Sequence, residues 1–498
     1  MKRVSTGFFP PISLDFSKKT PMYRQLYDWF RDAIVSGQLS PGQRVPSTRA
    51  LAAELKISRL PVLSAFEQLH AEGYLETLVG SGSMVSQSVP DDATRPTTTA
   101  RKVPARQKSP RKMSRLAAAA LSIQPQQWPA TLGPFRASLP ALDHFPMGIW
   151  SKLVARHSSS PIKHLMAYGG IMGYMPFREA IAEYLGAARA VRCTPDQVMV
   201  VTGSQQGLQL CAKVLFNPGD SIWMEEPGYP GAHQAFTAAG VRLCPIPADQ
   251  QGLSVKEGLR RCRLAKGAYL TPSHQYPAGT TMSAARRLEI LQWAARKRSW
   301  IMEDDYDSEF RFDSRPIGAL QGLDTDSTVI YIGTFSKVLF PALRLGYVVI
   351  PSDMVAAFSA VRETADLFSS TLYQAVLTDF IKEGHFARHL RRMRTLYMER
   401  RGVLVDAIQT ELRDTLEVIG AEAGMHLVVL LPPGVDDRDV ARRAAKNGLS
   451  VLPLSMCYLK KPCYLKRPPR GGLILGYGGT NAQEIQDGVK TLKASLAR

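Results

Sequence analysis

Cysteine is scarce in this chain. Six of its 498 residues are cysteines, and no two of them form a Cys-x-x-Cys pair. A disulfide framework or a zinc site built on paired cysteines is therefore not expected, so the sequence predicts no metal centre. The thiols are typical of a reduced, cytoplasmic protein.

Long apolar runs are also missing. No segment approaches the roughly 18–20 uninterrupted apolar residues that a membrane-spanning helix needs. The opening Met1-Lys2-Arg3 is not followed by the apolar stretch of a signal peptide, so we expect no membrane segment. Hydrophobic residues still make up 45% of the chain, which is enough for a sizeable core, and the length favours two or three domains.

Acidic residues are the minority among the charged ones. The chain has 43 aspartates and glutamates against 62 lysines and arginines, which gives a net charge of +19. Such a charge favours a polyanionic partner, for example a nucleic acid. Solubility alone is the other explanation, and a DNA-binding motif would decide between the two.

The N-terminal part of the chain carries such a motif. Apolar residues at helical spacing predict helices over residues 22–36, 48–55 and 59–71. Only Lys56-Ile57 separates the second helix from Ser58, a good N-cap for the third. Two short helices joined this tightly form a helix-turn-helix. The runs 74–78 and 83–85, on either side of Gly80-Ser81-Gly82, predict a β-hairpin that would be a wing.

Further motifs over residues 20–88 are Pro21-x-Tyr23-x-Gln25-Leu26, Gly37-x-Leu39-x-Pro41-Gly42, Leu51-Ala52, Gln68-Leu69 and Glu72-Gly73-Tyr74. Together they resemble the winged-helix domain of GntR-type regulators, which implies binding to a double-stranded DNA operator. The resemblance puts Arg49, Ser58 and Arg59 near phosphates or base edges, and the hairpin tip Gly80-Ser81-Gly82 in or over the minor groove. The chemistry agrees, because helix N-termini attract phosphate and arginine pairs with guanine.

One position departs from this pattern. Pro61 stands where such recognition helices often carry a threonine, so a hydroxyl contact is lost. Proline is nevertheless tolerated in a first helical turn. Arg49 and Arg59 also have a plainer interpretation as solvated helix charges, which the complete motif makes less attractive.

Between about residues 89 and 127 the hydrophobic periodicity fades. Eight lysines and arginines stand against Asp91 and Asp92, and five prolines interrupt the segment. This composition predicts a flexible basic linker. Its minimal role is that of a spacer, and its charge also suits non-specific contact with phosphates.

The most informative stretch lies further on. Thr334-Phe335-Ser336-Lys337 follow directly after the apolar run 329–332, a predicted buried strand. Open α/β sheets bind their ligands beyond the carboxyl ends of their strands, which is where Lys337 falls. Arg344 follows before a second strand-like run at 345–350. Alone, a lysine after a strand is most often a surface residue, but its companions change that interpretation.

Polar residues occupy comparable places in other stretches. Asp304 and Tyr306 follow the apolar run 300–302, and Tyr229 ends Glu226-Pro227-Gly228-Tyr229. Gly203-Ser204-Gln205 joins a buried strand to a helix, a turn that cradles phosphate because N–H groups and the helix dipole converge there. From about residue 128 onwards strands and helices alternate, which indicates an α/β fold with a mainly parallel sheet.

This constellation resembles the site of fold-type I pyridoxal-phosphate enzymes of the aspartate-aminotransferase type. The resemblance implies that Lys337 forms an aldimine with pyridoxal 5'-phosphate, its amine activated by burial and nearby cations. Asp304 would pair with the pyridinium nitrogen, Tyr306 would donate to the ring phenolate oxygen, and Tyr229 would stack on the ring. The same resemblance assigns the phosphate to Ser204, Gln205, Thr334 and Arg344, and assigns Tyr168 to the phosphate of the other subunit's cofactor.

The stretches 271–277, 303–310, 333–337 and 391–394, together with the order of the two domains, point to a narrower group. They resemble the MocR subfamily of GntR-type regulators, a winged helix-turn-helix fused to an aminotransferase-like domain. Fold-type I sites are built at a subunit interface, so a homodimer is expected. The predicted organisation is a DNA-binding domain at 1–88, a linker at 89–127 and a PLP-binding, aminotransferase-like domain at 128–498.

The residues that would grip a substrate are less complete than those that hold the cofactor. Ile474 stands where aminotransferases usually carry the arginine for the substrate carboxylate. Gly231 stands where some MocR regulators that sense an amino acid have a second arginine, and Tyr276 replaces an asparagine. A carboxylate is costly to bind in an apolar site without a cation, so efficient transamination is not favoured.

Two functions remain. The first is a transcription regulator in which PLP, or a small amine or amino-acid adduct of it, is the cofactor or effector that controls operator binding. The alternative is a PLP-dependent aminotransferase with a fused DNA-binding domain. The missing clamps favour the regulator, with little or no transaminase activity. A regulator with an empty site is disfavoured because the cofactor anchors are all present.

Overall fold

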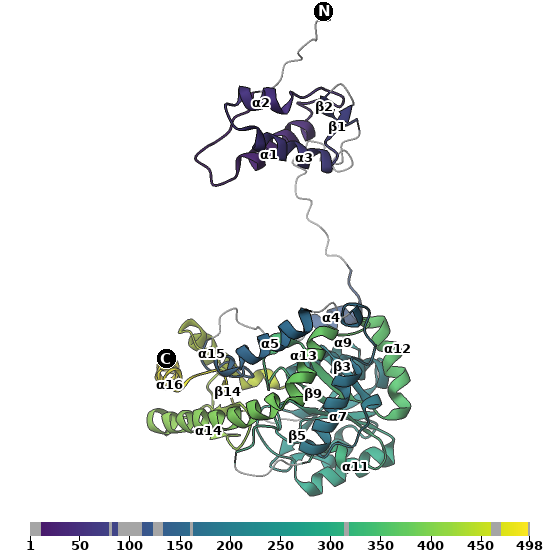
Figure 1. The fold of residues 1–498 in the computed structure, drawn as a ribbon. Helices are drawn as coiled ribbons and strands as arrows, with labels where there is room; N and C mark the ends of the chain where they lie inside the picture. The colour runs from purple at the N-terminus through teal and green to yellow at the C-terminus, as the bar shows by residue number, and fades with distance from the viewer. Residues whose placement is uncertain are drawn as a thin grey trace, which may run out of the picture. The chain divides into compact units, whose positions relative to one another are not determined.

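The computed structural model describes residues 11–78, 82–87, 112–122, 133–159, 163–312, 318–459 and 470–496. The chain divides into two compact units, Met1–Lys112 and Met113–Arg498 (Figure 1). Each unit has its own hydrophobic core. Among the helices of the described residues, none is long and apolar enough to cross a membrane.

The N-terminal unit is a small helical bundle with a β-hairpin, as the sequence predicts. Phe30 and Phe66 are buried and meet edge-on at 5.2 Å between ring centroids, which joins the first helix to the third. The Ser47 side chain caps the second helix by accepting a hydrogen bond from the N–H of Ala50. The elements are α1 (Met22–Val35), α2 (Thr48–Glu54), α3 (Arg59–Ala71), β1 (Leu75–Leu78) and β2 (Gly82–Val85).

The predicted linker differs from the structure near its C-terminal end. Helix α4 (Arg115–Ser122) falls within residues 89–127, and it belongs to the C-terminal unit. Its run of alanines, 117–120, favours a helix, and Leu116 lies beside Gly240 at the end of α9 (Pro230–Ala238). Proline and basic residues dominate the average composition of the segment and hide this short apolar stretch. The rest of the predicted linker, apart from residues 112–114, lies outside the described residues.

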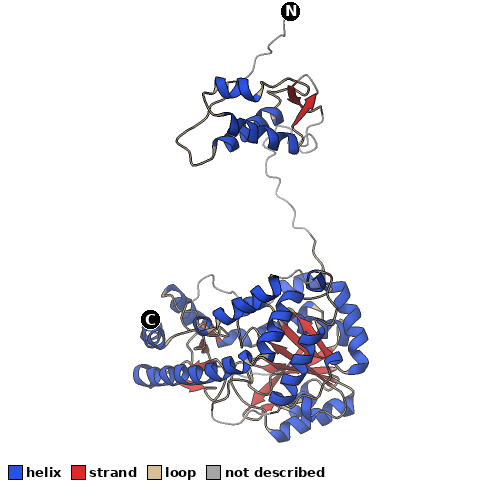
Figure 2. Ribbon diagram, in the orientation of Figure 1, coloured by secondary structure: helices blue, strands red, loops and turns tan. Residues whose placement is uncertain are grey.

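The C-terminal unit is built on a mostly parallel sheet with helices on both faces, which confirms the predicted α/β fold (Figure 2). The strand order is β3-β10-β9-β8-β7-β4-β5-β6. Strand β10 runs antiparallel to β3 and β9, and β6 runs antiparallel to β5. The bounds are β3 (Val198–Val201), β4 (Ser221–Glu226), β5 (Arg242–Asp249), β6 (Gly252–Leu253), β7 (Gly267–Leu270), β8 (Trp300–Asp305), β9 (Val329–Thr334) and β10 (Gly346–Val349).

Alternation along these strands sends side chains into two separate cores. On β9, Ile330 and Ile332 share a core with α8 (Ser204–Leu215) and α9. Tyr331 shares a core with α7 (Met175–Arg189) and α13 (Thr371–Lys382) on the other face. The helices of this unit, besides α4 and α9, are α5 (Met147–Ser158), α6 (Lys163–Met166), α7 (Met175–Arg189), α8 (Ser204–Leu215), α10 (Val255–Arg261), α11 (Ala284–Lys297), α12 (Val355–Ala365), α13 (Thr371–Lys382), α14 (His385–Leu412), α15 (Asp437–Lys446) and α16 (Ala482–Leu496).

A smaller antiparallel sheet lies towards the C-terminus, in the order β11-β12-β14-β13. Its strands are short, and side chains of β12 and β14 share a core with α14, α15 and α16. Strand β14 pairs with β12 so that Ile474 lies opposite Val428. This sheet supplies one wall of the candidate site. Its strands are β11 (Glu417–Ile419), β12 (His426–Leu430), β13 (Leu452–Pro453) and β14 (Gly472–Gly476).

Candidate functional site

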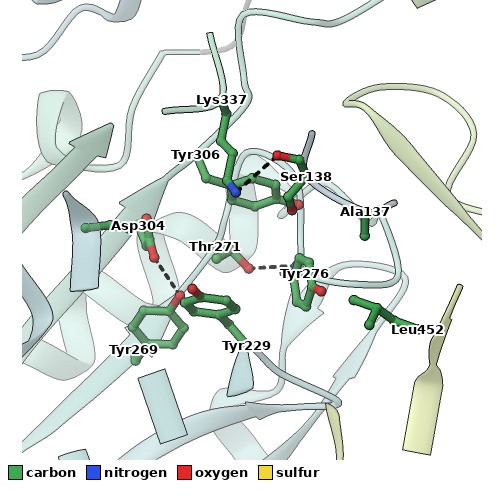
Figure 3. Close-up of a pocket in the computed structure, with 11 residues that line it drawn as sticks. Ala137, Ser138, Tyr229, Tyr269, Thr271, Tyr276, Asp304, Tyr306, Lys337 and Leu452 are labelled. Carbon is green, nitrogen blue, oxygen red and sulfur yellow. Dashed lines mark hydrogen bonds between the residues drawn. The ribbon is translucent and has the colours of Figure 1, made fainter. Parts of the chain in front are cut away.

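Lys337 lies in the turn that follows β9, at the carboxyl edge of the parallel strands. Its Nζ donates a hydrogen bond to the backbone oxygen of Ser138 at 3.3 Å (Figure 3). Burial lowers the pKa of Lys337 to about 8, although the charges of Asp307 and Asp304 oppose the shift. More of the amine is therefore neutral near neutral pH, and the neutral amine is the form that attacks a carbonyl.

Asp304 and Asp305 end β8 and, because successive side chains of a strand point to opposite faces, they reach different surroundings. Asp305 Oδ2 accepts hydrogen bonds from Arg189 Nε at 2.8 Å and from the Tyr331 hydroxyl at 2.6 Å. Burial alone would raise the pKa of Asp305, but Arg189 and these hydrogen bonds hold it below its ordinary value. The charge of Asp305 is thus paired with Arg189 within the fold, although its Oδ1 has no hydrogen-bond partner among the described residues.

Asp304 faces the pocket and has a different set of partners. Its Oδ2 accepts a hydrogen bond from the Tyr269 hydroxyl at 2.8 Å (Figure 3). Its Oδ1 is buried and has no hydrogen-bond partner among the described residues. Burial raises the pKa of Asp304 to about 7, against the hydrogen bond from Tyr269. A buried oxygen without a donor is costly, so this one fits the protonated nitrogen of a ring.

Aromatic rings line the space near Lys337 and Asp304. Tyr276 meets Tyr229 edge-on at 5.5 Å and Tyr306 edge-on at 5.9 Å between ring centroids. Flat faces of this kind suit a planar aromatic ligand. The residues that line the pocket are Ala137, Ser138, Ser204, Tyr229, Tyr269, Thr271, Tyr276, Asp304, Tyr306, Lys337 and Leu452 (Figure 3).

The N-terminus of α8 supplies an anion-binding end. Gly203 precedes the helix with a φ of 132°, a conformation open to glycine. A Cβ on Gly203 would lie 3.4 Å from both terminal nitrogens of Arg344, so the guanidinium group lies directly against this turn. Helix N–H groups and a planar arginine both favour a phosphate. A phosphorylated pyridine aldehyde would fit this pocket, which combines a lysine, a carboxylate, an aromatic wall and an anion-binding helix N-terminus.

The structure brings several predicted cofactor residues into one pocket, namely Ser204, Tyr229, Asp304, Tyr306 and Lys337. Gln205 does not line it, because its Nε2 donates to the Gly231 oxygen at 2.9 Å. Thr334 is buried at the end of β9, and its hydroxyl oxygen accepts a hydrogen bond from the N–H of Ser336 at 3.2 Å.

Tyr168 is predicted to contact the cofactor phosphate of the other subunit and not that of its own chain. It is 87% exposed and contacts Phe368 edge-on at 6.1 Å. It does not line the pocket of its own subunit. A contact with a partner subunit stays a prediction.

Sequence reasoning missed the wall residues Ala137, Ser138, Tyr269, Thr271 and Leu452. Tyr269 could have been found, because β7 lies next to β8 in the parallel sheet and Tyr269 pairs with Met302. Ala137 and Ser138 carry no motif. They reach the site because the N–H of Gly476 on β14 donates to the oxygen of Phe135 at 2.9 Å.

The two substituted clamp positions are filled by close packing. Ile474 is buried in an apolar cluster with Ala137, Tyr276, Val428, Leu454 and Cys457. A Cβ on Gly231 would lie 2.5 Å from Cζ of Tyr229, closer than atoms can approach. An arginine at position 231 would therefore displace the ring expected to stack on a ligand.

The predicted DNA-contacting residues lie at the start of α3 and on α2. Arg49, Ser58 and Arg59 are exposed, and Arg59 Nε donates to Thr48 Oγ1 at 3.1 Å. Ser58 makes no capping hydrogen bond with its side chain, so its hydroxyl does not occupy the helix N–H groups. Of the predicted wing tip, Gly80 and Ser81 lie outside the described residues, and Gly82 begins β2.

Two family models match the chain. The model for aminotransferase class I and II matches residues 152–466, and the model for bacterial regulatory proteins of the gntR family matches residues 22–85. The first corresponds to the unit that carries the Lys337 pocket, and the second to the winged-helix unit. Aminotransferases of this class depend on PLP.

Curated relatives share both units in the same order. The probable rhizopine catabolism regulatory protein MocR of Rhizobium meliloti is 39% identical over 97% of this chain and 96% of its own length. The pyridoxine biosynthesis transcriptional regulator PdxR of Corynebacterium glutamicum is 29% identical over 89% of this chain and 90% of its own length.

Solved structures match the larger unit. The kynurenine aminotransferase of Pyrococcus horikoshii has a TM-score of 0.67 and 27% identity, covering 78% of this chain and 95% of its own. LysN, the α-aminoadipate aminotransferase of Thermus thermophilus, has a TM-score of 0.67 and 29% identity, covering 73% and 91%. With the winged helix and the match to MocR along almost the whole chain, these findings show that the protein belongs to the MocR subfamily of GntR-type transcription regulators.

Proposed function

We propose that this protein binds pyridoxal 5'-phosphate through Lys337 and uses the bound group to control how its winged helices bind an operator. One observation carries the proposal. In a single pocket, a lysine with a lowered pKa accompanies a buried carboxylate, Asp304, whose Oδ1 has no partner in the described chain. Neither feature benefits an unliganded fold, because both desolvate ionisable groups.

The residues of the pocket suggest how the group is held. The Lys337 amine would condense with the aldehyde, forming a C=N bond and releasing water. Asp304 would accept from the protonated ring nitrogen, and Tyr229 would stack on the ring. Ser204 at the start of α8 and Arg344 would meet the phosphate. When bound, the group supplies a covalent anchor and an electron sink.

The substrate side of the pocket supports a regulator more than an efficient transaminase. Ile474 and Gly231 leave no arginine at the two clamp positions, and Ile474 is packed into an apolar cluster. An amino-acid carboxylate placed there would be desolvated without a cation. We therefore favour the cofactor itself as the signal over an amino acid. The alternative is an aminotransferase with a fused DNA-binding domain. It requires a cation from elsewhere to pair with the carboxylate of the substrate.

Substitution of Lys337 by alanine should abolish covalent attachment of pyridoxal 5'-phosphate. The wild-type protein, loaded and then reduced with borohydride, should keep a stable adduct visible by absorption and by mass. Lys337→Ala should keep none, because among the described residues no other lysine lines this pocket. Lys213→Ala, which removes an exposed lysine from α8, is the matched control. A covalent adduct retained by Lys337→Ala would assign the attachment to another lysine.

Arg59→Ala should weaken binding to a specific operator while leaving the cofactor spectrum intact. Loss of a bidentate base contact costs roughly 1–3 kcal/mol, or about 5- to 150-fold in affinity. The operator can be selected from random duplexes with wild-type protein, and affinity measured by anisotropy at fixed salt. Arg24→Ala on α1 removes an equal charge and separates a lost contact from a lost charge. Unchanged affinity in Arg59→Ala would shift the base contacts to Arg49 or the wing.

The protein should be a homodimer. Met166 and Tyr168 are 82% and 87% exposed. Large exposed side chains on the unit that carries the pocket suit an interface between subunits. The symmetric dimer would present two winged helices to two half-sites. Sedimentation at micromolar concentration should give twice the chain mass of 54.9 kDa. A monomer under these conditions would contradict the assembly and the proposed role of Tyr168.

Loading with pyridoxal 5'-phosphate should change operator affinity or footprint. An effector shifts an equilibrium only if it binds the two states differently, and imine formation changes the charge at Lys337. The comparison uses cofactor-free protein, loaded protein, and loaded protein with a panel of amino acids and amines. If only an amino acid changes binding, the cofactor serves as a sensor for that amino acid. If nothing changes binding while amine turnover is measurable, the aminotransferase alternative gains.

A further inference from the structure

A buried histidine and aspartate lie behind the tyrosine expected to meet the cofactor. The side chains of His274 and Asp307 are 2% and 1% exposed. His274 Nδ1 lies 2.9 Å from Asp307 Oδ1 and 2.9 Å from the Tyr306 hydroxyl oxygen. One ring nitrogen thus contacts both a carboxylate and a phenol, and it carries at most one proton.

The direction of the hydrogen bonds follows from donor and acceptor capacity. An ionised carboxylate only accepts, so the contact with Asp307 is favourable only when His274 Nδ1 carries the proton. A protonated Nδ1 has no lone pair, and the Tyr306 hydroxyl cannot donate to it. The Tyr306 oxygen can only accept a share of the same N–H. Its own proton must point elsewhere, and Tyr306 lines the pocket that contains Lys337.

The surroundings restrict His274 to this arrangement. A Cβ on Gly424 would lie 2.2 Å from His274 Cε1 and 2.6 Å from Asp307 Oδ2, so the backbone at Gly424 closes tightly over the pair. His274 Nε2 is buried without a hydrogen-bond partner among the described residues. A change of tautomer would bring the Nδ1 lone pair against a carboxylate oxygen and leave an unpaired buried N–H, which is unfavourable on both counts.

His426 does not compete for this role. Its ring lies 5.4 Å from that of His274 and stacks on Tyr306 at 6.5 Å. Burial lowers the pKa of His426 to about 4, so it is neutral near pH 7, and its Nε2 lies 3.1 Å from the Pro277 oxygen. The ionisable groups around His274 and Tyr306 are Asp307, His426, Tyr276, Asp304, Glu225 and Lys337.

We propose that Asp307 and His274 are positioning residues that direct the Tyr306 proton into the pocket, where it stabilises the phenolate oxygen of bound pyridoxal 5'-phosphate. The inference rests on the proposed function, since it requires the cofactor at Lys337. It goes beyond it by assigning a task to two residues that do not line the pocket. The pair determines how strongly Tyr306 donates.

The proposal predicts the direction in which the pH of imine deprotonation shifts. The phenolate oxygen shares the imine proton when the imine is protonated and carries an unshared charge when it is not. A donor from Tyr306 therefore stabilises the deprotonated form more, and lowers the pH at which the imine loses its proton. Removing the donor, or turning its proton away, should raise that midpoint.

The experiment is a visible-absorption pH titration of the full-length loaded protein. Tyr306→Phe should raise the midpoint. His274→Leu should raise it in the same direction, by roughly half a unit to one unit, as expected for one lost hydrogen bond. His274→Asn should retain the wild-type midpoint, because its amide places an N–H donor near the position of Nδ1. In the Tyr306→Phe background, His274→Leu should add nothing, because it acts through the missing hydroxyl.

Asp379→Asn is the control, since Asp379 lies 2.9 Å from His157 Nε2 in a more exposed His–Asp pair that does not line the pocket. Its midpoint should equal that of the wild type. Thermal unfolding identifies any variant that fails to fold. If His274→Leu is such a variant, the titration midpoints of His274→Asn and Tyr306→Phe are compared instead. An unshifted midpoint in His274→Leu, or an additive double variant, overturns the positioning role alone. A wild-type protein without any visible band overturns the proposed function itself, and the inference with it.

Discussion

The candidate site depends on two adjacent carboxylates that are buried together at the end of β8. Asp304 and Asp305 would repel each other in apolar surroundings if both faced the same side. The pleat of the strand sends them to opposite faces instead. Asp305 meets Arg189 and the Tyr331 hydroxyl, while Asp304 keeps one oxygen without a partner in the described chain. Asp305 Oδ1 also has no hydrogen-bond partner among the described residues, but the charge of Asp305 is paired with Arg189. Asp304 faces the pocket without such an ion pair in the described chain, so it is the acid available to a ligand.

Parallel pairing brings the lysine to the same edge. Asp304 lies opposite Ile332 and Asp305 opposite Gly333 in the β8–β9 ladder, so the turn that carries Lys337 leaves the sheet beside them. The same burial that raises the pKa of Asp304 to about 7 lowers that of Lys337 to about 8. Burial therefore makes the charged form of each group less favourable than it would be in water. An arriving cofactor with a basic ring nitrogen and an aldehyde suits this pair.

The differences from a working aminotransferase lie in the packing and not in the cofactor anchors. Ile474 belongs to a buried cluster of the smaller sheet, and Gly231 allows the Tyr229 ring to lie where a longer side chain would stand. A single substitution to arginine would have to open an apolar cluster at one position and displace an aromatic ring at the other. Under the proposed function, the pocket keeps residues suited to binding the group, and neither position offers an arginine to an amino-acid carboxylate.

The sequence by itself determined the α/β class, the winged-helix elements and the residues with motifs, because strand-end lysines, glycine turns and helix periodicity are local signals. Lys337, Asp304, Tyr229, Tyr306 and Ser204 were recognisable in this way, and the structure brings them into one pocket. Local signals did not reveal the α4 helix inside the basic segment, whose short alanine run is outweighed by its surroundings. Only the tertiary structure decided that Ala137 and Ser138 form a wall, since the nearby Phe135 is hydrogen-bonded to a strand more than three hundred residues away. It also decided which oxygen of Asp304 is left without a donor and that His274 lies between Asp307 and Tyr306. Such contacts join distant parts of the chain, and no pattern along the sequence records them.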